Sequence, residues 1–198
     1  MKTPSSMPKK PTQPFGTINF SKDGKVRPDI RQLSEDRVEQ EKGVIDIIAE
    51  HFGRMGHPIT DIKQLPESDH DFEATCEGNS VIIQLTELVS LDFHDPVTFL
   101  LDTEAEATAL SNVIGGKLDK HYAKPKGPGF WLVIFSTYPY ATEYRQGGVI
   151  KISPGLVNVR GFLAERNDNP FDEIWFSDLI TNPVRIFPVK RLGASGAR

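Results

Sequence analysis

Apolar residues recur at helical spacing in two stretches of the chain, and each stretch predicts a helix. The first helix should begin at Ser34 as the N-cap and end at Gly53 or Gly56. Its apolar face consists of Val38, Ile45, Ile48 and Phe52. The same spacing predicts a second helix over residues 102–122. A third helix is expected over 154–166, because its first residue is a proline, which is favoured in the first helical turn.

Between these helices, runs of alternating or continuous apolar residues predict strands. Residues 71–76 and 81–88 flank a turn at Gly78 of the kind that closes a hairpin. Both faces of 81–88 are largely apolar, so this strand should be central in the sheet and covered on both sides. The apolar run at 130–135 predicts another buried strand. Further strands are expected at 58–65, 171–176 and 184–189.

The order of these elements predicts a single α/β domain with one mixed sheet. The order is helix, three strands, helix, strand, and then a C-terminal annex with further strands. This body should span residues 33–192 and be followed by a flexible tail at 193–198. Residues 1–32 are rich in Pro, Lys, Ser and Thr, and their single apolar patch at 15–20 is small. We therefore expect these residues to form a mostly disordered arm.

Charge is distributed unevenly between this arm and the body. Residues 1–33 carry seven Lys and Arg against two Asp, a net charge of +5. The remainder carries 16 basic and 25 acidic side chains, a net charge of −9. Clustered basic residues favour contact with phosphate through counterion release. The alternative is that the arm is a solvated tail.

Composition narrows the class of protein further. The chain of 198 residues, 38% of them hydrophobic, suffices for one core. No apolar run reaches the roughly 20 residues of a membrane span, and none follows the first lysines as it would in a secretion signal. Cys76 is the single cysteine, which excludes a disulfide framework and a paired-cysteine zinc site. We therefore expect a cytoplasmic protein with no membrane partner.

Four polar positions on the predicted elements are candidates for a functional site. Gln84 and Thr86 lie two residues apart on a strand and therefore share one face. The hairpin turn brings Asp71 beside them. Glu41 falls on the apolar stripe of the first helix, where a carboxylate needs a partner, a metal or a proton.

These positions, and the order of elements over residues 34–137, resemble the PD-(D/E)XK nuclease superfamily, which has the restriction-endonuclease-like fold. The resemblance implies a metal-dependent endonuclease, a hydrolase that cuts phosphodiester bonds in DNA or RNA with Mg²⁺ or Mn²⁺. Glu41 matches the helix glutamate of the family, Asp71 the first aspartate, and Gln84 the second acidic position. In the family these three positions bind the metal. Thr86 matches the position of the lysine that orients or activates the attacking water.

Two of these positions depart from the family pattern. Gln84 offers a cation a carbonyl oxygen but no charge, and Thr86 has no ammonium group. Some members of the family carry the lysine on the following helix, where Lys117 and Lys120 are candidates. The resemblance therefore implies a nuclease with a variant active site. One alternative is a catalytically inactive protein of this fold that binds nucleic acid or a partner protein, and another is a small α/β interaction protein whose likeness to nucleases is accidental.

Overall fold

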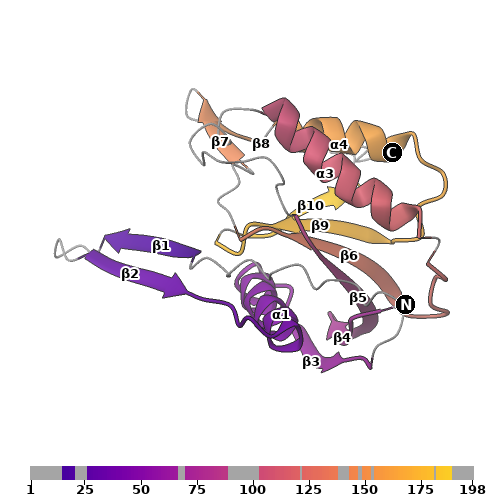
Figure 1. Ribbon diagram of the computed structural model, residues 1–198, viewed down its shortest axis with the longest axis horizontal. Helices are drawn as coiled ribbons and strands as arrows, with labels where there is room; N and C mark the ends of the chain where they lie inside the picture. Colours follow the sequence, from indigo (N-terminus) through magenta and orange to yellow (C-terminus); the bar gives the residue numbers. More distant parts are fainter. Residues whose placement is uncertain are drawn as a thin grey trace, which may run out of the picture.

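The computed structural model places a six-stranded mixed sheet at the centre of the protein, with helices on both of its faces (Figure 1). The structure describes residues 15–20, 26–66, 70–88, 103–120, 122–137, 143–146, 149–152, 154–180 and 182–188. Among the helices in this part of the chain, none is both long and apolar enough to cross a membrane. The predicted mixed α/β class is confirmed.

Antiparallel and parallel pairs share this sheet. Its strands, in their order across it, are β10 (Val184–Phe187), β9 (Glu173–Ser177), β6 (Gly129–Phe135), β5 (Asn79–Glu87), β4 (Phe72–Cys76) and β3 (Ile59–Gln64). The pairs β3–β4, β4–β5 and β9–β10 are antiparallel, whereas β5–β6 and β6–β9 are parallel. A parallel pair needs a crossover connection, and a helix supplies it between β5 and β6.

Each face of the sheet has its own helical layer. Helix α1 (Arg37–Arg54) covers one face, and α3 (Thr103–Leu118) and α4 (Pro154–Ala164) cover the other. Along β5, Ile83 joins the core beneath α1, and its neighbour Ile82 joins the core beneath α3 and α4. The central strand is therefore apolar on both sides, as its continuous hydrophobic sequence predicted.

Helix α1 begins two residues later than expected, because Asp36 and not Ser34 is its N-cap. The Asp36 carboxylate accepts the backbone N–H groups of Val38 at 3.0 Å and Glu39 at 3.1 Å. The Ser34 hydroxyl instead donates to the Glu39 carboxylate at 2.7 Å. Asp36 thus supplies the acceptor that the first helical turn requires.

Helix α1 ends at Arg54 with Met55 as its C-cap, and Gly56, one of the two glycines expected to end it, directly follows the cap. Gly56 has a φ of 84°, a left-handed conformation that costs glycine little. Its N–H donates to the Gly53 carbonyl at 3.1 Å, and the next N–H, from His57, donates to the Phe52 carbonyl at 3.0 Å. These two bonds form a Schellman motif that satisfies carbonyls at the end of the helix.

The hairpin between β4 and β5 fixes the register around the candidate site. Glu77 and Gly78 form its two-residue turn with φ values of 51° and 78°, the pattern of a type I′ turn. The pairing runs from Cys76 opposite Asn79 to Phe72 opposite Ile83. The predicted hairpin at Gly78 is therefore confirmed.

Two further hairpins were not expected from the sequence. The first pairs β1 (Phe15–Phe20) with β2 (Val26–Arg31), within the segment expected to be a mostly disordered arm, and the second pairs β7 (Glu143–Gln146) with β8 (Val149–Ile152). The expectation of disorder considered only the small apolar area of the arm, whereas backbone hydrogen bonds between two six-residue segments form the first hairpin. The tail expected at 193–198 lies outside the described residues.

The position of the N-cap gives a test of this helix boundary. We expect Asp36→Ala to reduce the free energy of unfolding by about 1 kcal/mol, because two N–H groups lose their acceptor. Ser34→Ala should cost less than about 0.5 kcal/mol, because its hydroxyl contacts an exposed side chain. Urea denaturation of both variants measures the difference. A larger loss in Ser34→Ala than in Asp36→Ala would contradict the assignment.

Candidate functional site

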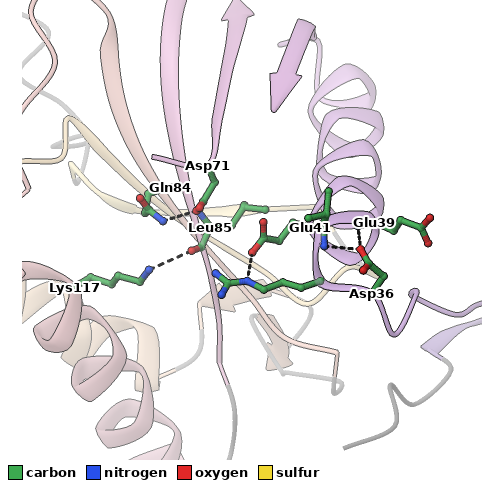
Figure 2. A network of polar contacts seen from close by, with 9 residues as sticks. Asp36, Glu39, Glu41, Asp71, Gln84, Leu85 and Lys117 are labelled. Carbon is green, nitrogen blue, oxygen red and sulfur yellow. Dashed lines mark hydrogen bonds and ion pairs between the residues drawn. The ribbon is translucent and has the colours of Figure 1, made fainter. Parts of the chain in front are cut away.

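The carboxylate of Asp71 lies at the centre of the candidate site (Figure 2). Asp71 directly precedes β4, and the hairpin register brings it beside Gln84 on β5. One carboxylate oxygen, Oδ2, accepts the backbone N–H of Leu85 at 2.7 Å and the side-chain amide N–H of Gln84. The predicted neighbourhood of Asp71 and Gln84 is therefore present.

The surroundings of Asp71 disfavour its ionised form. Burial raises the pKa of the carboxyl, the N–H of Leu85 lowers it, and the negative charge of Glu41 raises it. The positive charges of Lys117 and Arg37 lower the pKa of Asp71, but by less than burial raises it. A half-buried carboxyl whose pKa responds to three other charged side chains is typical of a functional site.

Gln84 contributes a buried oxygen to the site. Its side chain is turned so that the amide N–H₂ faces Asp71, because an ionised carboxylate can only accept hydrogen bonds. The residue is 5% exposed, and its Oε1 atom has no hydrogen-bond partner among the described residues. A buried carbonyl oxygen without a donor costs stability, and it is a ready ligand for a cation.

Lys117 reaches the site from the helix α3. Its ammonium group donates to the backbone carbonyl of Leu85 at 3.3 Å. Burial and the nearby charge of Lys120 lower the pKa of Lys117, whereas Asp71 raises it. The side chain is therefore turned inward to β5, and the peptide units on the two sides of Leu85 are bound by Asp71 and by Lys117.

Glu41 approaches from the opposite helical layer. Figure 2 shows it directed from α1 toward the end of the strands where Asp71 lies. Its carboxylate accepts from the guanidinium Nε of Arg37 at 2.8 Å, an i,i+4 pair on the helix. The Glu41 side chain is 20% exposed and that of Arg37 is 82% exposed. Glu41 thus has the partner that its position on the apolar stripe required.

Arg37 was missed in the sequence analysis. Its charge acts on both Asp71 and Lys117, so it belongs to the same group of charges. The i,i+4 spacing to Glu41 was a signal that could have found it.

Thr86 and Glu87 lie farther along β5 than Gln84. Thr86 is half-buried, and within the described residues no hydrogen bond links its hydroxyl to Asp71, Gln84 or Glu41. Glu87 accepts a hydrogen bond from Thr137, and burial raises the pKa of its carboxyl. Hydrogen bonds or charge interactions therefore link Glu41, Asp71 and Lys117, with Gln84 bonded to Asp71, whereas the assignment of Thr86 to the site stays a prediction.

The donor atoms of the site match a hard cation in type. Glu41, Asp71 and Gln84 offer oxygens of the kind that Mg²⁺ binds, and the Gln84 oxygen is unpartnered in the described structure. In the described ranges, no group of three or more His, Cys, Asp or Glu side chains forms a metal cluster. The negative charges of Glu41 and Asp71 are opposed by the positive charges of Arg37 and Lys117. We therefore expect the site to bind a metal weakly.

Comparisons with known proteins add no relative to this description. No family model, curated protein or solved structure matches the chain. The interpretation of the site therefore depends on its own geometry and chemistry.

The raised pKa of Asp71 predicts a pH-dependent loss of stability. Near the ordinary carboxyl value of 3.8 the group is largely protonated, and stability falls as the pH rises through the raised value of the folded state. Asp71→Asn removes this titration and keeps an acceptor for Leu85. We expect the variant to be more stable than wild type at about pH 7, with the difference shrinking toward about pH 4.

Urea denaturation at several pH values measures this difference. Asp46→Asn, which changes an exposed aspartate of α1, serves as the matched control. A stability difference between wild type and Asp71→Asn that does not vary with pH would contradict the prediction.

Proposed function

We propose that the protein is a metal-dependent nuclease with a restriction-endonuclease-like core and a variant active site. One observation carries the proposal: Asp71 and Lys117 bind the backbone on the two sides of Leu85, with Gln84 beside them. Asp71 directly precedes β4, Gln84 lies on β5 and Lys117 lies on α3. The three residues therefore come from separate parts of the sequence. An acid, an amide and a lysine that converge on one strand are the groups that such hydrolysis needs.

The order and pairing of the elements support the same proposal. Helix α1 is followed by the antiparallel strands β3, β4 and β5, then by α3 and the parallel strand β6. This is the helix–strand–strand–strand–helix–strand order on which the sequence resemblance to the PD-(D/E)XK superfamily rests. The proposed site lies where β4 begins beside β5.

A cation at this site would be held by Glu41, Asp71 and Gln84. A bound Mg²⁺ or Mn²⁺ supplies a Lewis acid and lowers the pKa of a water ligand. Gln84 and the Leu85 N–H fix the orientation of the Asp71 carboxylate, because both donate to one of its oxygens. The other oxygen of Asp71 takes no part in these two hydrogen bonds and would be the one available to a cation.

Lys117 provides the positive charge that Thr86 cannot. Its ammonium group is half-buried and is held by the Leu85 carbonyl at 3.3 Å. Negative charge develops on the oxygens of a phosphate when water attacks it, and a fixed cation in a partly desolvated place stabilises that charge. Lys117 thus takes over from α3 the role that the family assigns to the position of Thr86.

A second candidate function is nucleic-acid binding without cleavage. The observation that favours it is charge balance: Arg37 is paired with Glu41, and Lys117 acts on Asp71. These cations reduce the attraction of the site for a divalent metal. They would equally suit a surface that binds phosphate groups.

Cleavage assays on variants distinguish the two functions. We expect wild type to cut single- or double-stranded DNA or RNA with Mg²⁺ or Mn²⁺, and Asp71→Ala to abolish cutting because the metal loses its central ligand. Lys117→Ala should lower the rate about 100- to 1000-fold, because a fixed charge near the phosphate is lost. The matched control is Lys126→Ala, which removes an exposed lysine between α3 and β6 and should leave the rate near that of wild type.

Circular dichroism confirms that each variant is folded. Cleavage that survives Asp71→Ala, or equal rates for Lys117→Ala and Lys126→Ala, would contradict the proposed site. Absence of cleavage in wild type with all four substrates would favour the binding function.

A further inference from the structure

The Arg37–Glu41 ion pair lies at the solvent-exposed side of the candidate cation site. Glu41 faces inward and is 20% exposed, whereas the Arg37 side chain is 82% exposed. The guanidinium therefore lies on the accessible side of the site, within the field of Asp71 and Lys117. A macromolecular substrate that reaches Asp71 from solvent would approach this side.

Two ligands compete for the carboxylate of Glu41. Its Oε1 atom accepts the Nε–H of Arg37 at 2.8 Å, and the same carboxylate is a ligand in the proposed cation site. A cation bound there weakens the ion pair between Glu41 and Arg37. It competes for the carboxylate oxygens, and its positive charge repels that of the guanidinium. The guanidinium carries a planar set of N–H donors that matches the oxygens of a phosphate.

We propose that Arg37 binds a phosphodiester of the nucleic acid, and that Glu41 holds its guanidinium until a cation takes the carboxylate. This inference rests on the proposed function, since it assigns the substrate phosphate to a residue of that site. Cation binding and nucleic-acid binding are then coupled, because a bound cation weakens the ion pair that holds Arg37 to Glu41. Arg37 is thus a substrate-binding residue and also limits the affinity of the empty site for metal.

The cation side of this proposal is tested by calorimetric titration of Mn²⁺ into the metal-free protein. Arg37→Ala should bind Mn²⁺ about two- to fivefold more tightly than wild type, the range expected from loss of one exposed ion pair. The matched control is Arg54→Ala, which removes an exposed arginine of the same helix that also forms an i,i+4 pair, with Glu50. Its affinity for Mn²⁺ should equal that of wild type.

The phosphate side is tested without any metal, by fluorescence anisotropy of a short labelled DNA in EDTA. Glu41→Gln removes the ion pair with Arg37 and should tighten DNA binding about two- to fivefold. Adding Arg37→Ala to Glu41→Gln should abolish this gain and reduce the slope of log affinity against log salt by about one phosphate contact. The single variant Arg37→Ala completes the double-mutant cycle, because a simple loss of negative charge at residue 41 would tighten DNA binding equally with and without Arg37.

The outcomes separate this inference from the proposed function. Equal Mn²⁺ affinity in wild type and Arg37→Ala would overturn the competition for Glu41. A gain in DNA binding that persists in the double variant would overturn the role of Arg37 in phosphate binding. A wild type that binds no Mn²⁺ would overturn both the proposed metal-dependent function and the competition, whereas the EDTA titration tests phosphate binding by Arg37 independently of the metal.

Discussion

The hydrogen bond from the Leu85 N–H to the carboxylate of Asp71 is the interaction on which the candidate site depends. It joins the residue that precedes β4 to the middle of β5, where the sheet is covered on both faces. The Gln84 amide donates to the same oxygen, and Lys117 binds the carbonyl of Leu85 itself. Loss of the Asp71 carboxylate would remove the acceptor that orients both strand donors and the charge that attracts Lys117.

This arrangement concentrates unfavourable groups in one place. Burial disfavours the charged forms of both Asp71 and Lys117, and the Gln84 oxygen is buried without a hydrogen-bond donor in the described structure. Each of these features reduces stability, and a sequence selected for stability alone would replace them with apolar residues. Their presence together, beside a core that is otherwise apolar, supports a functional origin.

Local rules were sufficient to predict the part of the site that lies on one hairpin. A two-residue turn fixes the register of β4 and β5, so the proximity of Asp71 and Gln84 followed from counting residues. Lys117 could be proposed only as one of two lysines, because the contact with Leu85 depends on how α3 packs on the sheet. Thr86 was assigned from the family motif, and among the described residues no hydrogen bond joins its hydroxyl to Asp71 or Gln84. The hairpins β1–β2 and β7–β8 were missed because short pairs of this kind are stabilised by backbone pairing more than by an apolar pattern.

The central claim is that a divalent cation binds between Asp71, Gln84 and Glu41, and paramagnetic Mn²⁺ tests it most directly. Mn²⁺ broadens the NMR signals of nearby protons, so a titration followed by amide spectra locates the ion. The backbone amide of Leu85 and the side-chain amide of Gln84 should broaden first, and Asp71→Ala should abolish the effect. The indole N–H of Trp175, which donates to Glu173, is the internal reference and should stay sharp. Early broadening of the Trp175 signal with an unchanged Leu85 signal would contradict the account.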